Sequence, residues 1–276
     1  MPAPPATRVQ SITRSDADVL ATLIAAAEAA GKIALPFFRE GAKTTAVIQT
    51  KDGGSPVTEA DLAADAFLRR MLTAALPDVA WLSEESVDDS ERLAFQDVLI
   101  VDPIDGTRGF ITGDPRWTVC VALVRNGRPV AGVVHAPATG ETFSATQGGG
   151  AWLNGRRLAV STQAVVAGAK MAGPRGLLEA AGADISSVTW QPKIPSLAYR
   201  MALVASGAID AAFASANAHD WDIAAVDLIV REAGGVFAGL DGAPPIYNLA
   251  RPVHAALVAA PPALNRHIIK KGALNA

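Results

Sequence analysis

The sequence contains a single cysteine, Cys120, which lies inside the apolar run Trp-Thr-Val-Cys-Val-Ala-Leu-Val. One cysteine excludes a disulfide framework, and a thiol in such a run is more often a buried packing group than a nucleophile. The 24 lysine and arginine residues are scattered rather than clustered, and the formal net charge is -3. This distribution argues against a nucleic-acid groove and against binding to an anionic membrane surface.

Signals for export or membrane insertion are also missing. The first ten residues show no charged start followed by an apolar core. By inspection, no apolar run approaches the roughly 18 residues needed to span a bilayer. We therefore expect a cytoplasmic protein with no membrane partner.

The chain has enough apolar sequence for a large core, since 50% of its 276 residues are hydrophobic. Apolar residues at helical spacing predict a long helix within residues 15–38 and a second helix that begins near Thr58, a residue that can cap it. Asp61 lies on the apolar face of the second helix. A carboxylate in that place is either a helix cap or part of a site.

Beyond residue 79 the apolar pattern has a period of two, which predicts short strands near residues 79–86 and 98–105 and a meander over 117–160. The pairs Asn126-Gly127 and Asn154-Gly155 predict its hairpin turns. Past residue 165, strands are expected near residues 169–173, 209–215 and 254–260, and helices over 196–207 and 221–235 and at the end of the chain. We expect an α/β (α+β) fold of layered sheets and helices, with subdomains over residues 1–160 and 161–276 and a cleft between them.

Acidic residues gather at the ends of four predicted elements: Asp61, Glu84 with Glu85, Asp102 with Asp105, and Asp220 with Asp222. If these groups converge, they form an all-oxygen site that suits Mg²⁺ better than zinc, because the four histidines have no ligand spacing. Asp102 and Asp105 could serve adjacent ions, and the Ile104 carbonyl one of them. Two such ions can clamp a phosphoryl group. The alternative is that Asp102 only caps a turn.

Gly106 and Thr107 follow directly, and their backbone amides could hold a phosphate. Other phosphate chemistries fit less well. The chain has no Gly-x-x-x-x-Gly-Lys-[Ser/Thr] loop, and Ile104 stands where an aspartyl-phosphate enzyme needs a second acid. It also lacks the Gly-x-Ser-x-Gly elbow of many serine hydrolases. The residues favour attack on a phosphate ester by metal-activated water.

Four segments together resemble the signature motifs of the inositol monophosphatase superfamily, a group of magnesium-dependent phosphatases. They are GGSPVTEAD, WLSEES, DPIDGTRGF and WDIAAVDLIVREAGG, in the family's order, and the resemblance spans roughly residues 51–242. It implies a layered αβαβα sandwich and two or three Mg²⁺ ions per site. The metal ligands that it implies are Glu84, Asp102, the Ile104 carbonyl, Asp105 and Asp222.

The resemblance also implies that Asp61 and Thr107 orient the attacking water and help to deprotonate it. Lys51 matches the lysine of a mobile loop that closes over the site, and Glu85 is expected to support the ligands rather than bind metal. No motif role transfers to Asp220 or Asp227, for which we expect solvent exposure or helix capping.

The branch of the superfamily indicates the substrate. Leu-Ser-Glu-Glu at residues 82–85, and Arg108 followed by Phe110 and Ile111, resemble the 3'(2'),5'-bisphosphate nucleotidases of sulfur assimilation. The inositol branch carries Thr-Asn in place of Arg108-Gly109, although the segment from His219 onward fits that branch equally well. We expect removal of the 3'-phosphate of 3'-phosphoadenosine 5'-phosphate. Inositol 1-phosphate or histidinol phosphate is the alternative substrate, and a non-catalytic phosphate-binding protein is the alternative class.

A bisphosphate needs a cation for its second phosphate. Arg108 and Arg200 are candidates, and the Tyr199 ring could stack on adenine. The other interpretation is that Tyr199 packs in the core and that Arg200 is a solvated helix charge. We expect a small phosphorylated substrate, no nucleic-acid polymer and a monomer or homodimer.

Overall fold

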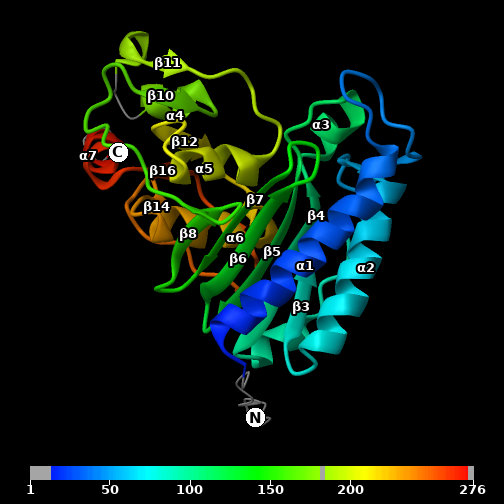
Figure 1. Ribbon diagram of the computed structural model, residues 1–276. Coiled ribbons are helices and arrows are strands. Elements are labelled where there is room, and N and C mark those ends of the chain that lie inside the picture. The colour runs from blue at the N-terminus through cyan, green and yellow to red at the C-terminus, as the bar shows by residue number, and fades with distance from the viewer. Residues whose placement is uncertain (1–13, 181–183, 273–276) are drawn as a thin grey trace.

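The computed structural model describes residues 14–180 and 184–272 and contains helices and sheets in alternating layers (Figure 1). The outer layer on one side consists of two long helices, α1 (Asp16–Ala34) and α2 (Glu59–Ala75). Ser15 caps α1, and Thr58 and Asp61 form a reciprocal capping box at the start of α2. The turn η1 (Leu35–Phe37) and the short strands β1 (Ile48–Thr50) and β2 (Pro56–Thr58) connect the two helices.

The second layer is a seven-stranded sheet in the order β3-β4-β5-β6-β7-β8-β9. Its strands are β3 (Ala80–Ser83), β4 (Asp97–Asp105), β5 (Thr118–Arg125), β6 (Arg128–Ala136), β7 (Glu141–Thr146), β8 (Gly150–Leu153) and β9 (Arg156–Arg157). Within this described sheet, β3 and β4 pair in parallel and the other neighbouring strands pair antiparallel. Asn126 and Gly127 both have positive φ, as do Asn154 and Gly155, so the two predicted hairpin turns are confirmed.

A third layer of helices separates this sheet from a second one. It contains α5 (Leu197–Ala205) and α6 (Asp220–Glu232), and α6 packs on β6, β5 and β7. The second sheet has the order β11-β10-β12-β16-β14, with β10 (Lys170–Ala172), β11 (Thr189–Trp190), β12 (Ala211–Ala214), β14 (Val236–Gly239) and β16 (Leu257–Ala260). The helices α4 (Arg175–Ala180) and α7 (Pro262–Gly272) complete the far side, so the expected αβαβα layering is confirmed.

Short elements link these layers. They are η2 (Ser90–Ala94), α3 (Thr107–Thr112), η3 (Ile185–Ser187), β13 (Ala218–His219) and β15 (Val253–His254). Three buried apolar clusters fill the spaces between the layers. One lies between α1, α2 and the first sheet, one between that sheet and α5 and α6, and one between the second sheet, α4 and α7.

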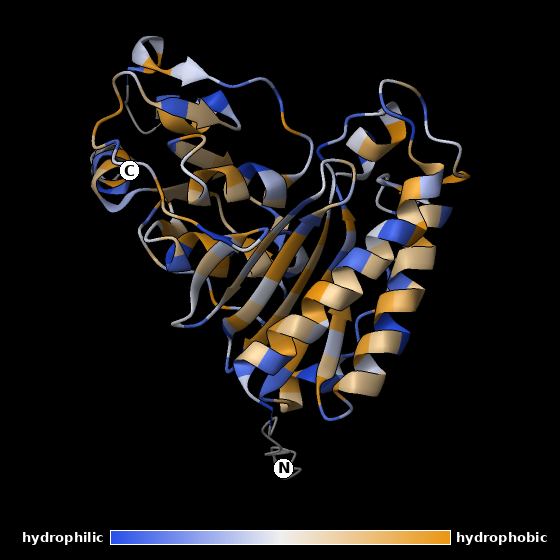
Figure 2. Ribbon diagram, in the orientation of Figure 1, coloured by the Kyte–Doolittle hydropathy of each residue, from blue (hydrophilic) through white to orange (hydrophobic). Residues whose placement is uncertain are grey.

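The expectation that no segment is long and apolar enough to span a bilayer was wrong for α1. Asp16–Phe37 is a 22-residue helical stretch with a mean hydropathy of 1.5, so by length and composition alone it could cross a membrane. In the fold it lies along the first sheet and beside α2 (Figure 2), and Val19, Leu23 and Ala30 are fully buried. Its apolar character therefore has a use in packing between layers.

Candidate metal-dependent active site

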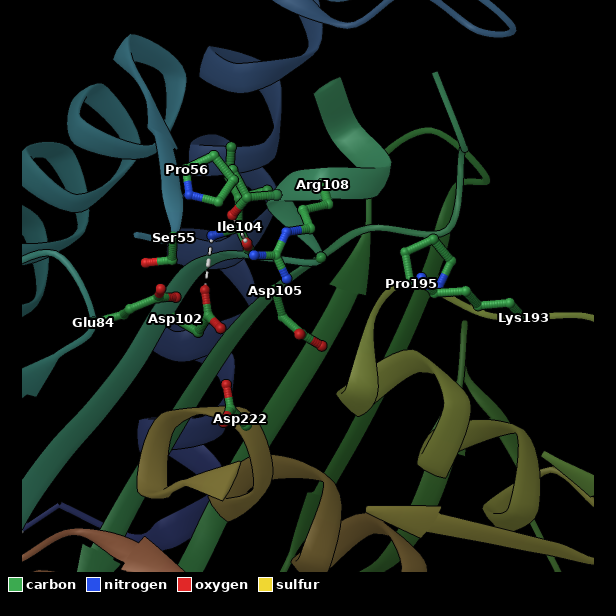
Figure 3. Close-up of a pocket in the computed structure, with 12 residues that line it drawn as sticks. Ser55, Pro56, Glu84, Asp102, Ile104, Asp105, Arg108, Lys193, Pro195 and Asp222 are labelled. Atoms are coloured by element: carbon green, nitrogen blue, oxygen red, sulfur yellow. Dashed lines mark hydrogen bonds between the residues drawn. The ribbon is translucent and has the colours of Figure 1, made fainter. Parts of the chain in front are cut away.

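The site is built at the end of β4, a fully buried strand that carries the acids Asp102 and Asp105. Across β5, Asp102 pairs with Cys120 and Asp105 with Thr118, and the register shifts between the two pairs. This irregularity accommodates Pro103 and Ile104 and brings both carboxylates toward the start of α6. One donor oxygen from each of Asp102, Asp105 and Asp222 lies within 4.8 Å of the others. Figure 3 shows these side chains converging from β4 and α6.

The acids destabilise one another in the absence of a cation. Burial raises the pKa of Asp102 well above its usual value, and Glu84, Asp105, Asp222 and Asp61 raise it further by charge repulsion. Burial followed by the charge of Asp105 also raises the pKa of Asp222 well above its usual value. Among the described residues, Asp102 Oδ2 is a buried oxygen with no hydrogen-bond partner. An all-oxygen donor set with one orphaned carboxylate oxygen fits a hard divalent cation such as Mg²⁺.

Asp105 is held from the other side by the start of α5. Its Oδ2 accepts hydrogen bonds from Ser196 Oγ at 2.5 Å and from the Ala198 amide at 2.7 Å, and its Oδ1 accepts one from the Leu197 amide at 3.2 Å. Burial raises the pKa of Asp105, and these hydrogen bonds oppose the rise. Ser196 was not singled out in the sequence, although a serine directly before a helical pattern is a recognisable N-cap signal.

Asp61 and Thr107 meet beside the cluster. Thr107 Oγ1 lies 3.1 Å from Asp61 Oδ1 and 3.0 Å from the Ile104 carbonyl. The other oxygen of Asp61 accepts from the amide and the hydroxyl of Thr58, which completes the capping box. Burial raises the pKa of Asp61. The two interpretations of Asp61 therefore do not exclude each other, because one oxygen caps α2 and the other contacts Thr107.

Lys51, in the turn between β1 and β2, places its Nζ 2.8 Å from both Glu84 Oε1 and Glu85 Oε1. Burial alone would lower the pKa of Lys51, but Glu84 and then Glu85 reverse this effect and raise it. Burial raises the pKa of Glu85 to about 7, against the opposing effect of Lys51. Lys51 is thus the cation that faces this edge of the site.

A cavity of about 270 Å³ opens over the cluster. It is lined by Ser55, Pro56, Glu84, Asp102, Ile104, Asp105, Gly106, Thr107, Arg108, Lys193, Pro195 and Asp222. The structure therefore brings eight of the expected site residues into one wall, with Asp61 and Lys51 in contact with two of them. Lys193 and Pro195 come from the segment before α5, and no motif in the sequence marked them.

Tyr199 and Arg200 do not line this cavity. The Tyr199 hydroxyl donates to Glu141 Oε2 at 2.6 Å, and its ring is buried against Phe143. Arg200 donates to the carbonyls of Ile194 and Phe213 and lines a different cavity. Its guanidinium is mostly buried, so it is not a solvated helix charge.

The expectation for Asp220 and Asp227 also needs correction, because neither is exposed. Asp220 is fully buried and accepts from the Asn248 amide at 2.7 Å, while its other oxygen lies 2.7 Å from His254 Nε2. Asp227 is 1% exposed and accepts hydrogen bonds from Arg231 and from the Tyr247 hydroxyl. Hydrogen bonds from Tyr247, Asn248 and His254, which lie far along the chain, tie both acids to segments outside α6 and so help to hold this helix in place.

Both the sequence and the fold of this chain match those of known proteins. A model of the inositol monophosphatase family matches residues 16–272. A 3'(2'),5'-bisphosphate nucleotidase CysQ of Aggregatibacter actinomycetemcomitans is 32% identical over 83% of this chain and 87% of its own. A histidinol-phosphatase of Mycobacterium tuberculosis is 35% identical over 71% of this chain and 78% of its own. The solved structure of a Thermotoga maritima IMPase superposes with a TM-score of 0.79 at 26% identity, covering 94% of this chain and 98% of that one.

Proposed function

The chain belongs to the inositol monophosphatase family, whose members hydrolyse phosphomonoesters, and on that premise we propose that it is a Mg²⁺-dependent 3'(2'),5'-bisphosphate nucleotidase. Its substrate is 3'-phosphoadenosine 5'-phosphate, from which water removes the 3'-phosphate. The observation that carries the hydrolase assignment is the convergence of three carboxylate oxygens within 4.8 Å beside the Thr107–Asp61 pair.

The residues divide the chemistry between them. Two or three Mg²⁺ ions would be held by Glu84, Asp102, the Ile104 carbonyl, Asp105 and Asp222. When bound, such ions neutralise the charge that develops on phosphate oxygens and lower the pKa of water. Within the chain, Thr107 Oγ1 can accept a hydrogen bond from the attacking water while it donates its own proton to Asp61 Oδ1. The raised pKa of Asp61 suits it to take up that proton.

The choice of substrate rests on Arg108 and on the relatives. Arg108 lines the cavity directly after Thr107, where a second phosphate of the substrate can contact it. The nucleotidase of A. actinomycetemcomitans matches most of the chain, which supports the same assignment. The histidinol-phosphatase relative supports a second candidate, hydrolysis of histidinol phosphate, and inositol 1-phosphate is the third. We expect a cytoplasmic enzyme that acts as a monomer or homodimer on a small phosphorylated substrate.

Phosphate release from a panel of substrates tests this proposal. With saturating Mg²⁺, 3'-phosphoadenosine 5'-phosphate should be cleaved at least about 10-fold more efficiently than inositol 1-phosphate or histidinol phosphate, a ratio that one charged contact can supply. EDTA should abolish release from every substrate. Arg108→Ala should reduce the preference. Equal or reversed efficiencies would reject the nucleotidase assignment. Fructose 1,6-bisphosphate completes the panel as a fourth substrate. If none of the four substrates releases phosphate in the presence of Mg²⁺, a phosphate-binding protein is favoured instead.

A further inference from the structure

A second cavity, of about 550 Å³, lies next to the metal cavity. Its wall is formed by the end of β11, the start of α4 and the segments that follow β10, β11 and β12, together with Arg200 from α5. Lys193 lines both cavities. The two residues after it line one each, Ile194 the second cavity and Pro195 the metal cavity, and Figure 3 shows Lys193 and Pro195 to one side of Asp105. A molecule bound at the carboxylates can therefore extend along this segment into the second cavity.

The charge of the second cavity is opposite to that of the metal cluster. Arg175, Lys193 and Arg200 line it, and its described lining residues include no acid. The Arg200 guanidinium is fixed by the Phe213 carbonyl at 3.0 Å and the Ile194 carbonyl at 3.2 Å. Burial lowers the pKa of Arg200, although the charge of Asp105 opposes this effect. Among the residues that the structure describes, the Arg200 guanidinium donates only to these neutral carbonyls, so it lacks the bonded anion that usually accompanies a buried guanidinium.

Two donors in this wall lack acceptors. In the described part of the chain, Arg200 Nε and Trp190 Nε1 are buried nitrogens without a hydrogen-bond partner. Native structures leave few such groups, and each calls for an acceptor from elsewhere. The Arg175 guanidinium lies 5.3 Å from the centre of the Trp190 ring, so a second cation is held against the same wall.

We propose that the second cavity, rather than Arg108 alone, binds an anionic group, a phosphate or a carboxylate, carried by the part of the substrate that is not cleaved. This inference rests on the proposed function, because the scissile phosphate must lie at the carboxylate cluster for the remainder to reach past Lys193. It assigns recognition to Arg175, Trp190 and Lys193, none of which belongs to a family motif quoted above. It disfavours an uncharged or cationic leaving group, which would leave the three cations without a counter-charge.

The first test compares two substrates that differ only in the second phosphate, 3'-phosphoadenosine 5'-phosphate and adenosine 3'-phosphate. The wild type should prefer the bisphosphate in kcat/KM by at least about 10-fold. Arg175→Gln, Lys193→Gln and Trp190→Phe should each reduce that preference by at least about 3-fold, and the double variant of Arg175 and Lys193 should reduce it further. Lys170→Gln is the matched control, since Lys170 is exposed on β10 and lies outside both walls. It should keep the wild-type preference.

The second test measures binding without metal or turnover. In EDTA, titration calorimetry should detect adenosine 5'-phosphate binding that is weakened by the three cavity variants and by salt, while adenosine and inorganic phosphate bind at least about 10-fold more weakly. Binding of inorganic phosphate as tight as that of the nucleotide would overturn the inference in favour of a site for free anions. Hydrolysis of both substrates with equal efficiency would overturn it and leave the hydrolase intact. If the wild type hydrolyses no substrate but its binding of adenosine 5'-phosphate is weakened by the three cavity variants, the proposed function is rejected and the anion site in the second cavity is supported.

Discussion

Replacing Asp102 by asparagine should stabilise the metal-free protein and destabilise it relative to the wild type once Mg²⁺ is added. Two unit charges 4.8 Å apart at an effective dielectric constant of about 20 repel by about 3.5 kcal/mol, and Asp102 faces both Asp105 and Asp222 within that distance. The raised pKa of Asp102 removes part of this repulsion in advance. We therefore expect a gain of about 1–2 kcal/mol in EDTA, or roughly 2–4 °C in Tm.

Asparagine preserves the local geometry. Its Oδ1 can still accept from the Ile104 amide, as Asp102 Oδ1 does at 3.0 Å, and its Nδ2 replaces the orphaned oxygen with a donor. Mg²⁺ at about 100 times its Kd should raise the stability of the wild type by about 2.7 kcal/mol, and the variant should lose most of this gain. The melting curves of the two proteins should thus exchange order between EDTA and Mg²⁺, and kcat should fall at least about 1,000-fold.

Thermal unfolding in EDTA and in a Mg²⁺ series measures the effect, and Asp227→Asn is its control. Asp227, on α6, is a buried acid like Asp102, but it lies outside the carboxylate cluster and accepts hydrogen bonds from Arg231 and Tyr247. Its variant should lose stability equally with and without Mg²⁺. If Asp102→Asn melts below the wild type in EDTA and still gains full stability from Mg²⁺, the charge-crowding argument and the metal assignment are both wrong.

Three further predictions follow from the same geometry. Asp61→Asn and Thr107→Val should each lower kcat at least about 100-fold with little change in KM, and the double variant should be no worse than the poorer single one; a lowered Tm with kcat intact would leave only the helix cap. In EDTA, the free energy of unfolding measured by calorimetry should fall as the pH rises from about 4 through 7, because acids with raised pKa values, such as Glu85 with a pKa of about 7, stay protonated in the folded state after the unfolded state has released the proton. Mg²⁺ should remove this decline, and a flat profile in EDTA would contradict the prediction. Gly106→Ala should cost about 1–3 kcal/mol in urea unfolding, since Gly106 has a φ of +94° and a Cβ there would lie 3.0 Å from the Ser196 nitrogen; a loss below about 0.5 kcal/mol would show that the loop adapts.

The sequence predicted the elements whose signals are local. The apolar spacing of α1 and α2, the Asn-Gly turns and the apolar strand before Asp102 each depend on residues within one segment, and each element formed where it was expected. The placement of acids at the ends of predicted elements also anticipated that Asp102, Asp105 and Asp222 would meet. Such convergence follows once the strand and the helix are packed in adjacent layers.

What the sequence did not predict depends on partners distant in the chain. Asp220 and Asp227 look like helix-surface acids, and only the return of Tyr247, Asn248 and His254 to α6 makes them buried and paired. The hydroxyl of Tyr199 is likewise fixed by Glu141 on β7. The strand β14 was missed as well, because its four residues follow the Gly-Gly pair that ends α6 and show no clear alternation.

The hydrogen bonds from Ser196, Leu197 and Ala198 to Asp105 join the start of α5 to the end of β4 at a proposed metal ligand. Asp105 ends a strand of the first sheet, whereas Ser196 begins a helix that packs on β12 of the second. We therefore expect occupation of the cluster to be coupled to the packing of α5 against the end of β4. Chelation should therefore accelerate amide hydrogen exchange in α5 as well as in β4. An ion bound at the end of β4 would in this way slow the local opening of the helix that packs on the second sheet.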